Sequence, residues 1–448
     1  WALALLTWPV TLFAALGCWL RLDPAQLESD PVLAGWLSIR CLLLPVARAA
    51  LGLAAVLTFV LALNNFAVPA ILQTKVFPAE IWLRFNTTFD TASALQLSWP
   101  LIVAPLLLLA LFRGREWNWP DAAGQGRARA LRRQLGRGWF GFCATAGTLV
   151  LALSAALPLA RLLGTARTWI ELPGAFAASQ PAVLHSFAYA AVTATLTVVP
   201  GLWLGRRWRI GWLLWIFFLV PGVLLGIGLI VLLNRPPFIA FYQSAGVVVL
   251  ALTVRHLALG WNGAALAMRR LDRDLTDAAR LDGASRWQIF SKVQWPQIAP
   301  LVFAAWYIVY LLCLWDVETL VLVIPPGGET LALRVFNLLH YGHNAQVNAL
   351  CLLLLTLAVL PLLAVVVFVR TRHFFSAQLR KNSSRVLTDA ATFVLLVTAL
   401  LWAGCEPPGD STEPANEARW ESGLFSRVEV IGSRGTGAGQ FNKPRSLA

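Results

Sequence analysis

The sequence contains little charge for its length. Lysine, arginine, aspartate and glutamate make up 13% of the 448 residues, whereas a soluble domain usually carries about 25%. Hydrophobic residues make up 58%, and the mean hydropathy is +0.67. Apolar blocks of about 20 residues recur along the chain, and each is long enough to cross a bilayer as a helix. The composition excludes an ordinary soluble enzyme and predicts an all-α polytopic membrane protein.

Several chemical motifs are missing from the chain. No GxxxxGK[ST] phosphate loop occurs, so the sequence lacks a backbone cradle for a nucleoside triphosphate. No CxxC occurs, and no cysteine has a histidine at metal-ligand spacing. Five of the six cysteines are expected to be small buried hydrophobes: Cys18, Cys41, Cys143, Cys313 and Cys351. His340 and His343 are interpreted as bystanders. We therefore expect no catalytic residue, no metal site and no cofactor on this chain.

The basic residues lie in short loops between the apolar blocks. The net charge is 36 − 22 = +14, which would suit nucleic acid, but this distribution indicates membrane topology instead and predicts no nucleic-acid partner. Ten spans are predicted, at 1–20, 41–63, 94–112, 139–163, 186–204, 210–234, 246–267, 299–318, 345–369 and 386–404. The basic loops then all fall on one side, which the positive-inside rule assigns to the cytoplasm.

Three landmarks recur at one offset along the chain. Pro45 and Pro296 differ by 296 − 45 = 251, Asn65 and Asp316 by 316 − 65 = 251, and Phe85-Asn86 and Phe336-Asn337 again by 251. A constant offset predicts two homologous, parallel repeats, as in several transporter folds. A second repeat of six spans leaves only three spans of the first, so we expect an N-terminally truncated form of a twelve-helix protein. The predicted domains are 1–113 (end of the first repeat), 114–138 (basic linker), 139–370 (second repeat), 371–404 (basic segment and apolar anchor) and 405–448 (polar tail).

A polar loop between two predicted spans carries the most specific pattern. Its landmarks are Asp277, Ala278, Ala279, Gly283, Val293 and Pro296. The spacing resembles the EAA-x3-G-x9-I-x-L-P signature of binding-protein-dependent ABC importer permeases, with Asp for Glu, Val for Ile and Trp for Leu. The resemblance covers residues 1 to about 370. The segment 325–342 is similar to one typical of fused, two-repeat permeases of ferric iron importers.

The residue types of this loop suit a docking element. Ala278 and Ala279 keep one helix face small, Gly283 can turn the chain with a positive φ, and Pro296 can open the next helix without losing a needed hydrogen bond. The alternative is an amphipathic helix lying on the membrane surface. The first repeat departs from the signature, because the offset places Gln26 and Val32 where Asp277 and Gly283 stand.

The resemblance implies a transport subunit of the bacterial inner membrane. Its implied partners are cytoplasmic ABC ATPase subunits that hydrolyse ATP, a periplasmic substrate-binding protein and the lipid bilayer. Ferric iron is the implied cargo, although thiamine, phosphonate or sulfate would use the same architecture. Arg255 is expected inside a span, where a charge needs compensation. Asp316 and Glu318, at the outer end of the following span, either pair with Arg255, line the pathway, or are solvated at the interface. The candidate pathway residues are thus Arg255, Asp316 and Glu318.

The C-terminal region changes character after the last predicted span. Residues 386–404 followed by Cys405 resemble a bacterial lipoprotein signal, with Cys405 as the lipidated residue, or form a plain anchor. Residues 431–448 resemble the start of an NHL-type propeller repeat, or a disordered tail. Two other functions are alternatives: a scaffold or sensor that anchors an external propeller, and a membrane-embedded transferase, which would need an acidic or histidine cluster that the sequence does not show.

Overall fold

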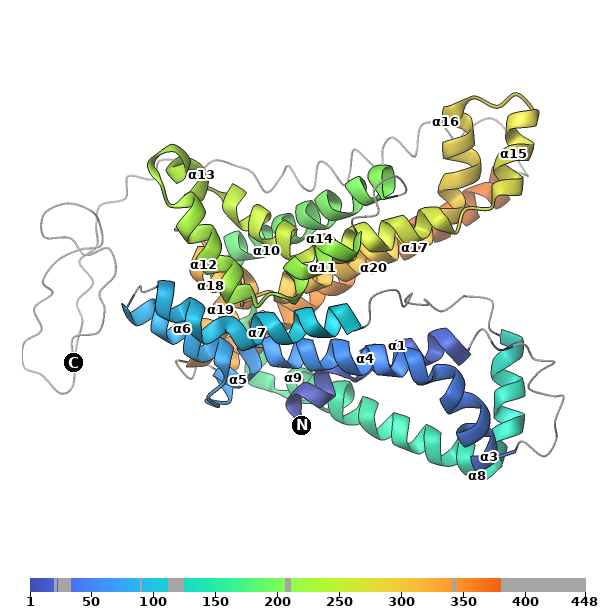
Figure 1. The fold of residues 1–448 in the computed structure, drawn as a ribbon, viewed down its shortest axis with the longest axis horizontal. Coiled ribbons are helices and arrows are strands. Elements are labelled where there is room, and N and C mark those ends of the chain that lie inside the picture. The colour runs from blue at the N-terminus through green and yellow to red at the C-terminus, as the bar shows by residue number, and fades with distance from the viewer. Residues whose placement is uncertain are drawn as a thin grey trace, which may run out of the picture. The chain divides into compact units, whose positions relative to one another are not determined.

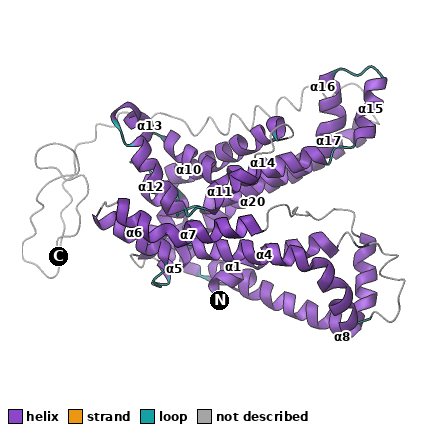
Figure 2. Ribbon diagram, viewed as in Figure 1, coloured by secondary structure: helices purple, strands orange, loops and turns teal. Residues whose placement is uncertain are grey.

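The described part of the protein is helical throughout. The computed structural model describes residues 1–19, 22, 34–88, 91–111, 125–205, 211–340 and 344–379, and these ranges contain no strand (Figures 1 and 2). The chain divides into two compact units, Trp1–Val367 and Phe368–Ala448. In the second unit the structure describes only the end of one helix. Almost all of the described residues therefore lie in the first unit.

Among its described residues, the N-terminal half of this unit contains three long helices and one of medium length, α6 (Phe77–Thr88). The long helices are α1 (Ala2–Trp19), α4 (Leu44–Asn64) and α7 (Thr91–Leu111). Three short elements connect them: α3 (Trp36–Ser38), the π-helix η1 (Ile39–Leu43) and α5 (Ala67–Ile71). Helix α1 packs against α4, and α6 packs against α7.

The C-terminal half supplies the remaining elements. The long helices, in chain order, are α8 (Gln125–Leu151), α10 (Ala166–Leu204), α14 (Ala245–Arg269), α17 (Trp295–Trp315) and α20 (Asn344–Leu379). The medium-length helices are α9 (Leu157–Gly164), α11 (Gly211–Leu219), α12 (Gly222–Leu233), α15 (Arg273–Leu281) and α19 (Leu331–His340). The short elements are η2 (Ala152–Ala156), η3 (Pro236–Phe238), α13 (Ile239–Tyr242), α16 (Arg286–Gln288), η4 (Ile289–Gln294) and α18 (Leu320–Val323).

Seven helical segments in the described residues are long and apolar enough to span a membrane. They are Ala2–Trp19, Trp36–Asn64, Arg132–Gly164, Ala166–Leu204, Ala245–Arg269, Arg286–Trp315 and Asn344–Phe368. Each overlaps a span predicted from the sequence, which confirms an all-α polytopic membrane protein. Helix α7, predicted as the span 94–112, contributes only a shorter apolar helix at Gln96–Leu107. The tenth predicted span, 386–404, lies outside the described residues.

The predicted span at 210–234 contains a break between two helices. Helices α11 and α12 meet at an angle of 96°, because Pro221 interrupts the helix and stands as the N-cap of α12 with a ψ of 139°, outside the helical region. Proline has no N–H and its ring clashes with the preceding turn, so it ends or kinks a helix. The apolar composition of both pieces concealed the break. This broken helix becomes part of the candidate site.

The landmarks at offset 251 coincide with matching elements. Helices α4 and α17 start 295 − 44 = 251 residues apart and end 315 − 64 = 251 residues apart. Each follows a π-helix, each has proline in its first two positions, and each ends at a residue in extended conformation, Asn65 or Asp316. These shared features support the two-repeat arrangement that the sequence predicts.

Helices α10, α14 and α17 approach one another closely through glycines. A Cβ added to Gly201 on α10 would lie 2.7 Å from the Trp261 Cα, and one added to Gly260 on α14 would lie 2.5 Å from the Thr197 Cβ. Small residues of this kind allow membrane helices to gain van der Waals contact without a hydrophobic driving force between them. The three helices therefore form a tightly packed frame for the residues that α14 and α17 carry.

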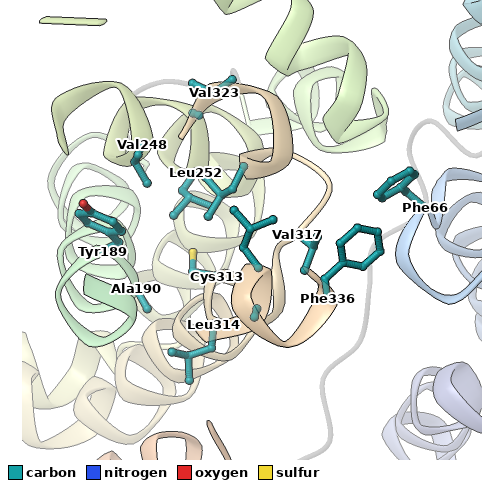
Figure 3. Close-up of a cluster of buried hydrophobic side chains, with 14 of the residues drawn as sticks. Phe66, Tyr189, Ala190, Val248, Leu252, Cys313, Leu314, Val317, Val323 and Phe336 are labelled. Carbon is teal, nitrogen blue, oxygen red and sulfur yellow. The ribbon is translucent and has the colours of Figure 1, made fainter. Parts of the chain in front are cut away.

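The largest core cluster joins the two halves. Phe66, Ile81, Phe85 and Leu101 from the first half belong to the same cluster as Leu252, Leu314 and Phe336 from the second. The Phe66 ring lies 5.5 Å from the Phe336 ring, centroid to centroid (Figure 3). The junction between α4 and α5 is thus held against the second half by apolar contact, and polar contacts are found beside it.

Candidate functional site

The polar loop between α14 and α17 forms a helical hairpin. Asp272 caps α15, and its side chain accepts a hydrogen bond of 2.9 Å from the Asp274 N–H. Gly283 turns the chain with a φ of +76°, a conformation that glycine adopts without steric cost. Ser285 and Gln288 then form a reciprocal capping box at α16, and the chain continues through η4 into α17. Local sequence therefore specifies both short helices.

The landmark residues occupy different environments along this hairpin. Asp277 and Ala278 are exposed on α15, and Ala279 is half-buried. Asp277 pairs with Arg280 at 2.9 Å on the exposed face of the same helix. Val293 lies in η4, and Pro296 occupies the first turn of α17. The structure thus places five of the six residues on one continuous hairpin and the sixth, Pro296, at the start of the long helix that follows.

One residue that the sequence pattern did not single out joins the hairpin to α17. The Gln297 amide oxygen accepts a hydrogen bond of 3.1 Å from the Asp272 N–H, and its amide nitrogen donates one of 2.8 Å to the Val293 carbonyl. Gln297 therefore connects the start of α15 with the first turn of α17. A single glutamine carries no sequence signal for such a role, because the partner positions depend on how the hairpin folds.

Apolar side chains on this hairpin are unusually exposed. Leu281 is 90% exposed, Trp287 73% and Leu275 53%. On the predicted topology they face the cytoplasm, where they are not expected to be covered by lipid. Exposed apolar side chains on a polar cytoplasmic segment suit contact with another protein. A cavity of about 350 Å³ at the start of the hairpin is lined in part by Arg269, Arg273 and Arg280.

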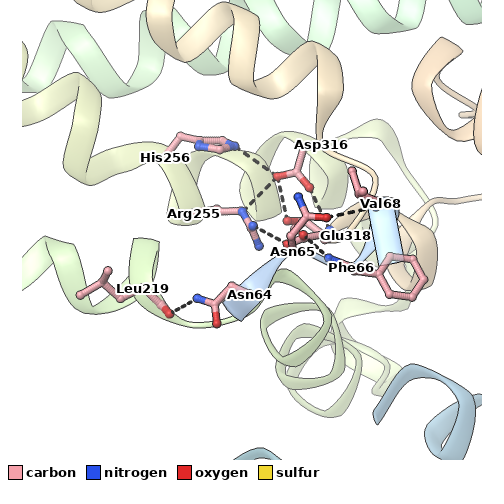
Figure 4. Close-up of polar contacts among 10 residues, drawn as sticks. Asn64, Asn65, Phe66, Val68, Leu219, Arg255, His256, Asp316 and Glu318 are labelled. Atoms are coloured by element: carbon pink, nitrogen blue, oxygen red, sulfur yellow. Dashed lines mark hydrogen bonds and ion pairs between the residues drawn. The ribbon is translucent and has the colours of Figure 1, made fainter. Parts of the chain in front are cut away.

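A second group of residues lies deep in the unit, where α14 meets the end of α17 (Figure 4). The Arg255 Nε lies 3.2 Å from the Asp316 Oδ2, and the Arg255 Nη2 donates a hydrogen bond of 2.6 Å to the Glu318 Oε2. The His256 Nε2 lies 3.2 Å from the same Asp316 oxygen. The side chains of Asp316 and Glu318 are only 3% and 11% exposed. The structure therefore brings together Arg255, Asp316 and Glu318, and it excludes solvated carboxylates at the interface.

Asp316 also organises the turn that follows α17. Its Oδ1 accepts a hydrogen bond of 2.9 Å from the Thr319 N–H, and its Oδ2 accepts one of 2.9 Å from the Thr319 hydroxyl. This Asx-type turn ends the helix and directs Glu318 back toward Arg255. With His256 neutral, one arginine faces two carboxylates, so the formal charge of the group is −1. Burial is tolerable because both acids are paired and hydrogen-bonded.

The guanidinium of Arg255 lies against the first residue of α12 in the broken helix. A Cβ added to Gly222, the first residue of α12, would overlap the Arg255 Nη1. The missing side chain of Gly222 therefore creates the space that the arginine occupies. The sequence pattern did not indicate Gly222, because the apolar stretch around it looked like an uninterrupted span.

Two predicted positions and one predicted feature lie where the structure describes no residue. Gln26 and Val32 of the first-repeat loop, and Cys405 with the NHL-like segment, fall outside the described residues. In the described part of the chain, no three His, Cys, Asp or Glu residues are grouped as they would be around a metal ion.

Comparison with known proteins gives a consistent family. Residues 174–378 match the model of the binding-protein-dependent transport system inner membrane component. The chain is 26% identical, over 198 residues, to the putative 2-aminoethylphosphonate transport system permease protein PhnV of Salmonella paratyphi A, covering 40% of this chain and 73% of that protein. It is 23% identical, over 353 residues, to the Fe(3+)-transport system permease protein FbpB 2 of Haemophilus influenzae, covering 75% and 68%.

A shorter match points in the same direction. The chain is 34% identical, over 88 residues, to the putrescine transport system permease protein PotI of Escherichia coli K12, covering 20% of this chain and 31% of that protein. All three are named as transport-system permeases, and the family match contains the hairpin, α17 and the buried Arg255 group. Residues 174–378 therefore form a domain of the binding-protein-dependent transport system inner membrane component family, within a multi-pass protein of the inner membrane.

Proposed function

We propose that this chain is the permease subunit through which an importer moves a cargo across the inner membrane. A periplasmic binding protein delivers the cargo, and separate ATPase subunits drive alternating access from the cytoplasmic side. The observation that carries the proposal is the hairpin 273–294, a capped and hinged element with exposed apolar side chains that continues directly into α17.

The hairpin suits rigid-body transmission. Helix α15 is anchored to α17 through Gln297, and the helical path from Arg286 to Trp315 is 30 residues long. A helix rises about 1.5 Å per residue, so displacement at the hairpin is carried over roughly 45 Å to the buried charges at Asp316. Closure of an ATPase that holds α15 would therefore move the far end of α17.

The docking step can be tested by crosslinking. In a cysteine-free background, Leu281→Cys is combined with cysteines placed on the ATPase surface, and the assembled complex is oxidised in nanodiscs. We expect a disulfide between the two chains, because Leu281 is 90% exposed. Lys75→Cys is the matched control, since it is exposed in a loop predicted on the opposite side of the membrane. Absence of a Leu281 crosslink in an intact complex would overturn the docking role.

Ferric iron is the cargo we propose. The support is that FbpB 2, named as a Fe(3+)-transport permease, matches over 353 residues and 75% of this chain, whereas PhnV and PotI match over 40% and 20% of it. The test is ATP-dependent uptake into proteoliposomes that contain the permease, its ATPase and its binding protein. We expect uptake of ferric iron in competition with 2-aminoethylphosphonate and putrescine. Uptake of either competitor alone would contradict the iron assignment while leaving the permease function intact.

A further inference from the structure

The carboxylate of Glu318 connects the two halves of the unit. Its Oε2 accepts the hydrogen bond from Arg255 in the second half, and its Oε1 accepts one of 2.7 Å from the Phe66 N–H in the first half (Figure 4). The Phe66 N–H is available because Asn65 ends α4 in an extended conformation. A charged acceptor makes such a bond stronger than a neutral one. One buried side chain therefore holds a backbone group of the other half.

A second polar contact lies two residues away in the first half. The Asn64 amide donates a hydrogen bond of 2.6 Å to the Leu219 carbonyl. Because α11 ends at Leu219, this carbonyl is one of the unpaired acceptors found at a helix C-terminus. The α4–α5 junction is thus attached at one point to the broken helix and at another to the end of α17.

The depth of this junction suits a role in movement between the halves. Arg255 stands ten residues after the start of the span Ala245–Arg269, which corresponds to about 15 Å along the helix axis. The hydrocarbon core of a bilayer is about 30 Å thick. Counted along α14, Arg255 therefore lies about half-way through a span of that thickness.

Any displacement of α17 also acts directly on this connection. Asp316 is the C-cap of α17, and Glu318 follows two residues later in the turn that Asp316 holds. If α17 moves, Glu318 moves with it and can keep Arg255, which belongs to the same half. The hydrogen bond between Glu318 and Phe66 must then break, because Phe66 belongs to the first half.

We propose that Glu318 is a latch: it holds Phe66 in the observed state and releases it when α17 is displaced during transport. This inference rests on the proposed permease function and adds the place where the two halves separate. The bond to a backbone N–H makes the latch independent of the Phe66 side chain. The apolar contact between Phe66 and Phe336 then has to open in the same step.

Hydrogen exchange at the Phe66 amide reports directly on its hydrogen bond to Glu318. The measurement is made on the full complex of permease and ATPase in nanodiscs. We expect Glu318→Ala to speed exchange at Phe66 by about tenfold, since a hydrogen bond to a charged group is lost. Glu318→Gln should give a smaller increase, because an amide oxygen can still accept the bond. Glu80→Gln is the matched control: Glu80 is a half-exposed carboxylate paired with Arg84 at 3.6 Å on α6, and exchange should not change.

Nucleotide binding supplies the decisive comparison. With a non-hydrolysable ATP analogue, protection of the wild-type Phe66 amide should fall to the level of Glu318→Ala. Unchanged protection in the nucleotide-bound complex, or unchanged exchange in Glu318→Ala, would overturn the latch. These readouts do not depend on the cargo. Failure of the docking role is seen separately, as loss of the Leu281 crosslink, so failure of the latch and failure of the proposed function are distinguishable.

Discussion

The α4–α5 junction and the α17–α18 junction share one turn and differ in their chemistry. In the first, the Asn65 Oδ1 accepts a hydrogen bond of 3.0 Å from the Val68 N–H. In the second, the Asp316 Oδ1 accepts one of 2.9 Å from the Thr319 N–H. The pairs are related by 316 − 65 = 251 and 319 − 68 = 251. The same side-chain-to-backbone turn ends both helices, once with an amide and once with a carboxylate.

The difference lies in the partner helix. The positions equivalent to Arg255 and His256 are Ala4 and Leu5 of α1, since 255 − 251 = 4 and 256 − 251 = 5. A carboxylate at Asn65 would therefore have no arginine from the equivalent helix. The turn requires only an acceptor, whereas the charge requires a counter-ion. The comparison teaches that the fold of the junction is shared and that the ionic group is specific to the second half.

Removing the counter-ion Arg255 should have the largest effect of the changes that test this comparison. Arg255→Ala gives the second half the residue of the first and leaves Asp316 and Glu318 buried without their cation. Loss of one partner of a buried pair costs about 3 to 5 kcal/mol, so we expect a strong fall in thermal stability and in assembled yield. Arg84→Ala, which removes an exposed pair on α6, should have little effect. Equal stability of both variants would show that Arg255 does not compensate these acids.

Filling the space beside Arg255 tests the role of the broken helix. Gly222→Ala would place a Cβ against the guanidinium, and we expect a cost of about 1 to 3 kcal/mol, as for other overpacked sites. Gly228→Ala is the control on the same helix, because a Cβ there meets nothing within 4 Å. Gly228→Ala should be neutral or stabilising, since alanine favours a helix interior. Thermal unfolding in nanodiscs measures both, and equal behaviour would contradict the proposed crowding.

A smaller effect is expected where a tyrosine of α17 donates a hydrogen bond to α20. Pro361 lies inside α20 and cannot donate to the carbonyl four residues earlier, that of Leu357. The Tyr310 hydroxyl donates a hydrogen bond of 2.9 Å to this carbonyl. The equivalent position in α4 is Phe59, since 310 − 251 = 59, and this residue is 55% exposed.

Tyr310→Phe should therefore cost about 1 kcal/mol, the usual net value of one hydrogen bond. The effect should shrink in a Pro361→Ala background, where α20 can satisfy its own carbonyl. A double-mutant cycle on thermal stability measures this coupling. Additive effects would mean that Tyr310 does not compensate the proline.

Much of the architecture could be read from the pattern of residues. Apolar blocks predicted the spans, and the constant spacing of Pro45 and Pro296 predicted matching helices, because membrane insertion and helix capping are local properties. The turn at Gly283 was predicted for the same reason. The break at Pro221 was missed, because apolar residues on both sides of a proline are compatible with either a kinked span or a broken one.

The group around Arg255 was predictable only in part. The cost of an unpaired charge in a membrane indicated that Arg255 needs a partner and offered Asp316 and Glu318 as candidates. Nothing in the spacing indicated that Phe66, 252 residues away, donates to Glu318, or that Gly222 makes room for the arginine. Those contacts join segments distant in sequence, and no local pattern encodes a backbone N–H as a partner.

The sequence by itself determined that the chain crosses the membrane many times, that matching landmarks recur in its two halves, and that a capped hairpin precedes α17. These features follow from hydropathy, helix capping and turn preferences, which act over a few residues. The tertiary structure decided which carboxylate faces which cation, where the halves touch, and which carbonyls a broken helix leaves for others. The reason is physical: a buried charge is stable only beside its partners, and the fold alone brings those partners together.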